Sequence, residues 1–177
     1  MEKKDLKPAG VFKYFEEICQ VPRPSKKEEK MIAYLKAFGA KHNLETKVDE
    51  AGNVLIKKPA TPGKENLQTV VLQSHIDMVC EKNNDVQHDF LTDPIETEID
   101  GEWLKAKGTT LGADNGIGVA TELAILADDS IEHGPLECLF TVDEETGLTG
   151  AFALKEGFMS GDILLNLDSE DEGEIFI

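Results

Sequence analysis

The sequence is short of cysteine and of long apolar runs, and each shortage excludes a class of protein. Its three cysteines, Cys19, Cys80 and Cys138, are odd in number and widely spaced. This pattern supports neither a disulfide framework nor a CxxC zinc site, so we expect reduced and mostly buried thiols. No apolar run approaches the ~20 residues of a membrane-spanning helix, and the opening segment MEKKDLKPAG lacks the apolar core of a signal peptide.

Basic residues are also scarce relative to acidic ones. The chain has 18 lysines and arginines against 35 aspartates and glutamates, a formal net charge of −17. Such a charge repels nucleic acid and anionic membrane surfaces, so neither is an expected partner. Together with the missing signal peptide, it predicts a cytoplasmic protein, some of whose carboxylates are available to hold a cation.

What the sequence does contain is a regular pattern of apolar segments in a chain of 177 residues, 40% of them hydrophobic. AGVFKYFEEICQV and SKKEEKMIAYLKAFGAKHNL have helical spacing, the second with Ser25 and Glu28 as a candidate capping box. A third, buried helix is predicted in NGIGVATELAILADD, just after Asp114. No repeat, linker or domain boundary divides the chain.

Short apolar or alternating runs predict the strands. LETKVD and NVLIKKP flank the turn EAGN, while IETEID and EWLKA flank Asp100 and Gly101 in a hairpin that we expect at a sheet edge. TVVLQ, LECLFTV and DILLNL read as buried strands. Strands that alternate with helices indicate an α/β fold whose sheet is at least partly parallel and covered on both faces.

Three of these strands end in possible metal ligands. TVVLQ leads to His75 and Asp77, LECLFTV to the acidic run 143–145, and DILLN to Asp168. Active sites of open α/β sheets form at the carboxyl ends of strands, so these residues are expected to converge. Asp114, in the loop that opens a helix, is a further candidate, with a helix N-cap as the alternative interpretation.

The spacing within two of these clusters suggests divided roles. His75 and Asp77 stand two apart, so in extended backbone both face one side, and Asp77 could orient a metal-binding imidazole. A core histidine beside a solvated aspartate is the alternative. Glu144 and Glu145 could reach one site only if the backbone bends, and would then pair a cation ligand with a proton-handling carboxylate. An exposed acidic turn is the alternative here.

The segment NLDSEDEGE also has part of the pattern of a calcium-binding loop. Asp168, Glu170, Glu172 and Gly173 fall at loop positions one, three, five and six. The glutamate required at position twelve lies beyond the chain end, and no flanking helix is predicted. Only Asp168 is therefore kept as a candidate ligand.

Taken in order, SHIDMV, GTTLGADNGIG, DEETG and NLDSEDEGE resemble the co-catalytic zinc metallopeptidases related to peptidase T and carboxypeptidase G, above all their dipeptidase branch. The likeness covers nearly the whole chain, including ICQVPRPS and DPIETEIDGEWLKAKGTT. It implies a three-layer α/β/α sandwich with a mixed central sheet, zinc-exopeptidase-like and incomplete at the C-terminus. It also implies hydrolysis of unblocked dipeptides, with a C-terminal histidine as a candidate preference and a homodimer as a candidate assembly.

The resemblance further implies two divalent metal ions, zinc in the first place and cobalt or manganese as alternatives. His75 and Asp168 would ligate one ion, Asp114 would bridge both, and Glu145 would ligate the other. The remaining implied roles fall to Asp77, which would orient the histidine, and to Glu144, which would be the general base. Relatives also tend to hold a non-proline cis peptide after the bridging aspartate, here Asp114–Asn115.

Two departures from the family pattern stand out. Cys80 occupies a position where many relatives have proline, and the chain ends at Ile177, before the family's last metal-binding histidine and its inserted lid domain. We therefore expect residues 1–177 to be the N-terminal part of a catalytic domain, inactive or weakly active alone. The remaining histidines are not in a context to replace the absent ligand: His42, His88 and His133.

Two other functions stay open beside the dipeptidase. One is a deacylase of N-acyl amino acids, which would use the same ions on the same fold. The other is a non-catalytic metal-binding fragment. Activity on free dipeptides, compared with N-acyl amino acids, separates the dipeptidase from the deacylase, and robust dipeptidase activity of residues 1–177 alone would refute the non-catalytic fragment.

Overall fold

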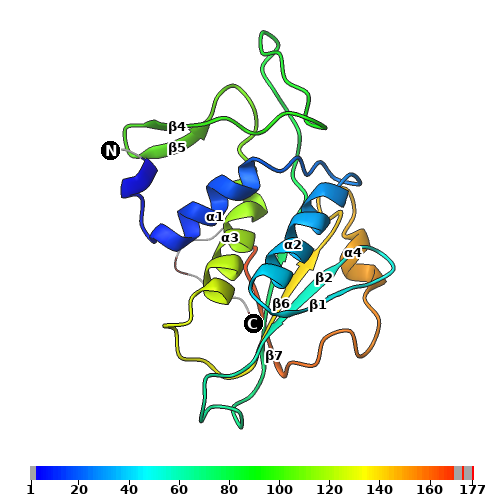
Figure 1. The fold of residues 1–177 in the computed structure, drawn as a ribbon. Helices are drawn as coiled ribbons and strands as arrows, with labels where there is room; N and C mark the ends of the chain where they lie inside the picture. The colour runs from blue at the N-terminus through cyan, green and yellow to red at the C-terminus, as the bar shows by residue number, and fades with distance from the viewer. Residues whose placement is uncertain (1–2, 170–172, 174–176) are drawn as a thin grey trace.

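The computed structural model describes residues 3–169, 173 and 177 as a sheet with helices on one side and shorter segments on the other (Figure 1). The helices are η1 (Lys3–Asp5), α1 (Ala9–Cys19), α2 (Glu29–Lys41), α3 (Ala113–Ala127) and α4 (Thr149–Ala153). The strands are β1 (Glu45–Val48), β2 (Val54–Lys58), β3 (Val70–His75), β4 (Thr97–Asp100), β5 (Trp103–Ala106), β6 (Leu136–Thr141) and β7 (Ile163–Asn166).

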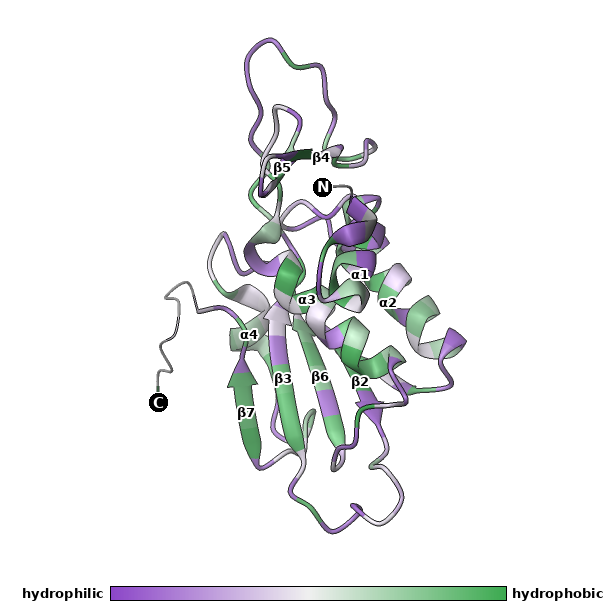
Figure 2. Cartoon of the chain, turned by 90° about the vertical axis from the view of Figure 1, so that its left-hand side faces the viewer, coloured by the Kyte–Doolittle hydropathy of each residue, from purple (hydrophilic) through white to green (hydrophobic). Residues whose placement is uncertain are grey.

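The main sheet is mixed, with strand order β1-β2-β6-β3-β7. β1 and β2 are antiparallel to their neighbours, whereas β3 runs parallel to both β6 and β7. The carboxyl ends of β6, β3 and β7 therefore point to one edge of the sheet, as their arrowheads do in Figure 2. The predicted α/β fold with a mixed, partly parallel sheet is confirmed.

Alternation along the strands divides the apolar side chains between two faces. Ile56, Leu72 and Phe140 belong to the large core under α1, α2 and α3, while Leu55, Val71 and Leu139 form a small core on the other face. That second core is covered by partly buried side chains from the segment after α4: Leu154, Phe158 and Met159.

Coverage of both faces is only partly as predicted. β7 forms an edge of the sheet, and its apolar side chains are exposed: Ile163 by 39%, Leu164 by 48% and Leu165 by 48%. In the part of the chain that the structure describes, the segments packed on the two faces of the sheet leave these three side chains partly open to solvent. Among the described residues, no helix is both long and apolar enough to cross a membrane.

The capping box predicted for α2 is wrong. α2 begins at Glu29, and Glu28 at the N-cap position makes no side-chain capping bond. The Ser25 hydroxyl donates instead to Asp77, and the Glu28 carboxylate accepts from the backbone N–H of Asp143. Both side chains thus connect the turn before α2 to the ends of other elements.

The hairpin around Gly101 has the predicted strands but not the predicted place. β4 and β5 form a separate two-stranded sheet rather than an edge of the main one. This arm is joined to α1, because the Thr97 hydroxyl donates to Glu16 at 2.7 Å and the Ile95 N–H donates to the Cys19 carbonyl at 2.8 Å. Tertiary contacts with a helix therefore replace pairing with the main sheet.

All three cysteines are free, as predicted. Cys19 and Cys138 are buried, and Cys80 is partly buried.

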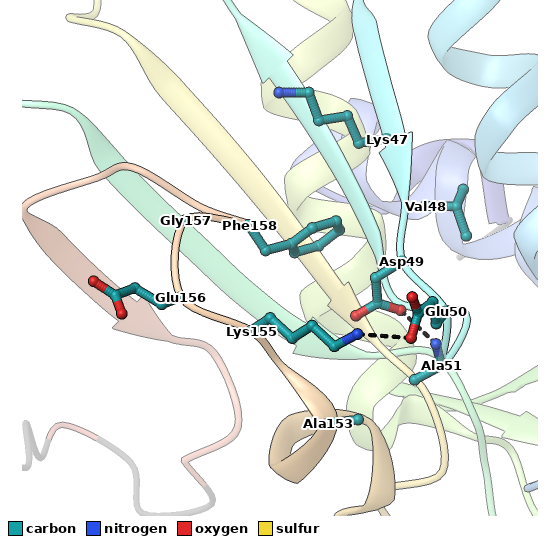
Figure 3. A pocket seen from close by; sticks show the side chains of 10 residues that line it. All are labelled: Lys47, Val48, Asp49, Glu50, Ala51, Ala153, Lys155, Glu156, Gly157 and Phe158. Atoms are coloured by element: carbon teal, nitrogen blue, oxygen red, sulfur yellow. Dashed lines mark hydrogen bonds and ion pairs between the residues drawn. The ribbon is translucent and has the colours of Figure 1, made fainter.

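A cavity of about 810 Å³ lies between the β1–β2 turn and the segment after α4, where Lys155 reaches Glu50 and Phe158 lies over the strands (Figure 3). None of the predicted site residues lines this cavity.

A buried carboxyl group in α3 predicts a pH-dependent stability. Glu122 is fully buried; one oxygen accepts from the Ser74 hydroxyl at 2.7 Å, and the other has no hydrogen-bond partner in the part of the chain that the structure describes. Burial raises the pKa of Glu122 well above its ordinary value, against smaller effects of Ser74 and Cys138. The folded chain therefore holds this proton more tightly than the unfolded chain, and stability is lost as pH rises above the ordinary value of 4.5.

Glu122→Gln, which cannot ionise, is expected to remove this pH dependence. The melting temperature of the variant relative to wild type should rise by about 2 °C or more between pH 5 and pH 8. Thermal unfolding of the full-length gene product that contains residues 1–177 measures it, with exposed Glu156→Gln as the matched control. A difference from wild type that is the same at both pH values would contradict the prediction.

Candidate functional site

The site is built around His75, the last residue of β3, whose side chain is 1% exposed. Its Nδ1 lies 3.2 Å from Asp77 Oδ1, so the pair contact one another as their spacing predicted. Its Nε2 faces three further carboxylates, at 3.0 Å from Asp114, 3.7 Å from Asp168 and 3.9 Å from Glu144. One imidazole nitrogen is thus held by a carboxylate, and the other points into an acidic cluster.

Asp114 and Asp168 reach this cluster from different elements. Asp114 lies in the first turn of α3 with non-helical backbone angles, and the peptide bond to Asn115 is cis, as the resemblance implied. Its carboxylate contacts His75 rather than capping the helix, whose N-cap residue is Gly112. Asp168 follows β7 and accepts a hydrogen bond from the Asn115 amide at 2.5 Å.

Glu144 and Glu145 lie in the turn after β6, where the backbone makes the bend that both would need to reach one site. Asp143 has a φ of +50°, which turns the chain sharply in a left-handed conformation. The N–H groups of Glu144 and Glu145 then donate to the two oxygens of Asp77, at 3.0 Å and 3.2 Å. Asp77 therefore holds both the histidine and the turn that carries the two glutamates.

The charges in the cluster shift its pKa values strongly. Burial alone would lower the pKa of His75, but the bonds to Asp77 and Asp114 and the charge of Asp168 raise it to about 9. Burial would raise the pKa of Asp77, but His75, the Glu144 N–H and Ser25 lower it to about 2. Burial, with the neighbouring carboxylates, raises the pKa of Glu144 and of Glu145.

The residues present fit a divalent metal centre. Two groups of ligand atoms lie within 4.8 Å of one another, His75 with Asp114 and Asp168, and His75 with Glu144 and Glu145. Imidazole nitrogen and carboxylate oxygen are the ligands of zinc and similar ions. Among the described residues, no lysine or arginine forms an ion pair with these four carboxylates, and His75 is the one basic side chain that faces three of them, an excess of negative charge that suits a cation.

Four residues of the site were missed as functional by the sequence prediction. The buried Arg23 guanidinium donates to the carbonyls of Ile76, Asp77 and Gly112, which ties the end of β3 to the loop before α3. Local patterns offered no signal for it beyond its position between two prolines. The other missed residues contact the cluster directly or through Asp143: Ser25, Glu28 and Asn115.

The remaining candidates lie away from the cluster. His42 packs on the ring of Phe38, His88 packs on Phe90, and His133 contacts the Gly134 carbonyl, so within the described ranges none belongs to a metal-binding group. Glu170 and Glu172 of the calcium-loop hypothesis lie outside the described residues. The thiol of Cys80 lies 3.5 Å from the Met78 carbonyl, just beyond the end of β3.

Comparison with known proteins agrees with this geometry. Residues 71–172, more than half of the chain, match peptidase family M20/M25/M40. The chain belongs to this family. The match begins within β3 and includes every residue of the cluster around His75.

Relatives within the family are close. The cytosol non-specific dipeptidase of Escherichia coli (strain K12) is 52% identical over 99% of this chain and 36% of that protein. The crystal structure of aminoacylhistidine dipeptidase from Vibrio alginolyticus superposes with a TM-score of 0.94 at 56% identity, over 98% of this chain and 35% of that one. Aminopeptidase PepT from Bacillus cereus gives a TM-score of 0.77 at 26% identity, over 92% and 43%. The chain thus spans about a third of the length of its two more similar relatives.

Proposed function

We propose that the full-length protein containing residues 1–177 is a cytoplasmic metallopeptidase that hydrolyses unblocked dipeptides. The observation that carries the proposal is the convergence of His75, Asp114, Asp168, Glu144 and Glu145 at the carboxyl edge of the sheet. The names of the Escherichia coli and Vibrio relatives support dipeptides as the substrate class, and the first also supports the location.

We further propose that these side chains hold two divalent ions, with zinc as the first choice. His75 and Asp168 would bind one ion, Asp114 would lie between the two, and Glu145 would bind the other. Such ions act as Lewis acids toward the scissile carbonyl and make water more acidic at neutral pH. The donor chemistry supports a divalent-metal site, since His75 forms one group of possible ligands with Asp114 and Asp168 and another with Glu144 and Glu145.

The protein groups themselves provide orientation and proton transfer. Asp77 Oδ1 lies 3.2 Å from Nδ1 of His75 and would accept its proton in a hydrogen bond, which would leave Nε2 to bind an ion. Glu144 would take the proton of the attacking water and pass it to the leaving amine. Its partly buried position and raised pKa suit a carboxylate that must both accept and release a proton.

We propose that residues 1–177 are the N-terminal part of the catalytic domain. Both dipeptidase relatives are matched over only 36% and 35% of their length, although nearly the whole of this chain is aligned. The remainder of the catalytic domain and a lid would follow, and would supply the rest of the ligand set. Experiments on function therefore use the full-length gene product.

The proposal is tested by chelation with several substrates. The full-length protein is expected to release free amino acids from dipeptides, to lose this activity on metal removal, and to regain it with Zn²⁺. The metal content, measured by mass spectrometry in parallel, should approach two ions per chain. Supplying an N-acyl amino acid in place of the dipeptide should give much slower release, because the homology favours dipeptidases over deacylases.

Each alternative has its own outcome in this experiment. Faster hydrolysis of N-acyl amino acids than of dipeptides would indicate the deacylase. Metal binding without hydrolysis of either substrate would indicate a non-catalytic metal-binding protein. Activity that survives complete metal removal would overturn the metallopeptidase proposal itself.

A further inference from the structure

We propose that Glu28 is a positioning residue for the glutamates of the site, and that Ser25 assists it. The inference rests on the proposed function, and concerns a segment that precedes α2 and supplies none of the proposed ligands. From the local sequence these two residues are expected to cap α2, but in the structure their side chains form hydrogen bonds with residues far away in the sequence. What they hold is the turn after β6, which carries Glu144 and Glu145.

The hydrogen bond between Glu28 and Asp143 is buried, and it joins residues far apart in the sequence. Its Oε1 accepts the N–H of Asp143 at 2.9 Å across 115 residues, and the N–H of Lys26 at 3.0 Å. As whole residues, Glu28 is 6% exposed and Asp143 5%. A buried N–H without an acceptor is strongly disfavoured, so the bond to Asp143 favours this geometry of the turn.

The turn needs such support because of its backbone conformation. Asp143 is a non-glycine residue in the left-handed region, and it is followed at once by Glu144 and Glu145. Left-handed φ angles in residues other than glycine persist when surrounding contacts determine them. At Asp143 the N–H donates to Glu28, the carboxylate accepts from the Thr146 hydroxyl at 2.6 Å, and the carbonyl accepts from the Thr149 N–H at 3.0 Å.

Ser25 acts on the other side of the same turn. Its hydroxyl donates to Asp77 Oδ2 at 2.7 Å, the oxygen that also accepts the N–H of Glu145. The segment around it has its own constrained geometry, since Lys26 has a φ of +65° and Pro24 bridges to Met78. Ser25 and Glu28 therefore reach the turn from one short segment, one through Asp77 and one through Asp143.

Two other buried carboxylates lie close to that of Glu28. The carboxylates of Glu28, Asp77 and Asp143 lie within 4.8 Å of one another, and all three residues are buried. Like charges at such a distance repel, and a neutral acceptor at position 28 would make the same backbone bond at lower electrostatic cost. This predicts that the acceptor oxygen at position 28, rather than its charge, is what orients the glutamates.

The test compares Glu28→Ala with Glu28→Gln in the full-length, zinc-loaded protein. Glu28→Ala is expected to lower kcat per zinc-loaded site on a dipeptide by about 10- to 100-fold with little change in KM. Glu28→Gln retains the acceptor and should stay close to wild type. Exposed Glu29→Ala, the neighbouring position, is the matched control and should leave both constants unchanged.

A second readout does not depend on activity. Calorimetric titration of the apo-protein with Zn²⁺ should show weaker binding in Glu28→Ala by about 10-fold, because the ligand Glu145 lies on the turn that loses its anchor. Zinc binding by Glu28→Gln and Glu29→Ala should match wild type. If the wild type proves inactive, the proposed function fails while this titration still decides the positioning role.

A specific result would overturn the positioning role of Glu28. A purely structural role for Glu28 would lower the melting temperature and the folded fraction, but leave kcat per loaded site and zinc affinity at wild-type values; that outcome overturns the inference. Should Glu28→Ala not fold, Ser25→Ala and Ser25→Thr replace it. Loss of kcat in Ser25→Ala with recovery in Ser25→Thr supports the inference, and wild-type kcat in both refutes it.

Discussion

Replacing Glu144 by glutamine is expected to lower kcat on a dipeptide by about 10³-fold, within the range that general bases contribute. Glutamine keeps the size of the side chain beside His75, where the Glu144 carboxylate lies 3.9 Å from Nε2. It cannot accept a proton from water, so the chemical step should fail while KM changes little. Steady-state kinetics of the full-length protein, with metal content measured on the same sample, tests this.

Metal content is what makes the Glu144→Gln result specific. The variant should bind as much zinc as wild type, because Glu144 is proposed as a base and not as a ligand. Exposed Glu156→Gln, on the cavity away from the site, should leave kcat unchanged. A loss of less than about tenfold would mean that another group takes the proton, and a loss of zinc would move Glu144 into the ligand set.

Asp77→Asn is expected to lower kcat/KM by about 100-fold or more, although the two side chains have nearly the same shape. One oxygen of Asp77 accepts from His75 and from the Glu144 N–H, and the other from the Glu145 N–H and Ser25. An amide replaces one of these acceptors with a donor. Whichever way it is turned, a buried NH₂ group then faces a backbone N–H.

The measurement for Asp77→Asn combines kinetics with zinc titration. We expect weaker zinc binding, since the imidazole of His75 loses its orienting acceptor, and a lower kcat, since the turn with Glu144 loses its anchor. Asp85→Asn, at an exposed position of the loop before β4, is the matched control. Near-wild-type values for Asp77→Asn would show that the carboxylate holds neither group.

Much of the fold could be predicted because it follows from local patterns. α1, α2 and α3 bury the apolar stripes that their sequences predict, and the strand candidates all appear, with β3 continuing to His75. Burial of apolar side chains dominates the choice of helix or strand, and its period is visible in the sequence. The contact between His75 and Asp77 could be predicted for the same reason, since their separation matches the strand repeat.

Two of the errors arose where local patterns have more than one solution. The segments around Gly101 predict a hairpin, but not whether it pairs with the main sheet; contacts of Thr97 and Ile95 with α1 decide that. Ser25 and Glu28 match a capping box, yet a hydroxyl donor and a carboxylate acceptor can be satisfied equally well by distant groups. Their partners, Asp77 and the Asp143 N–H, become neighbours only when β3 and β6 pair.

By itself, the sequence determined the α/β class, the positions of nearly all helices and strands, and the candidate ligands at the strand ends. Tertiary structure alone decided that Asp114 faces His75 rather than capping α3, and that Asp77 holds the turn of Glu144 and Glu145. The physical reason is one of range. The apolar periodicity that predicts a helix or strand depends only on residues close together in the sequence. A hydrogen bond can join residues at any separation in the sequence, and it forms where the folded backbone brings donor and acceptor within about 3 Å.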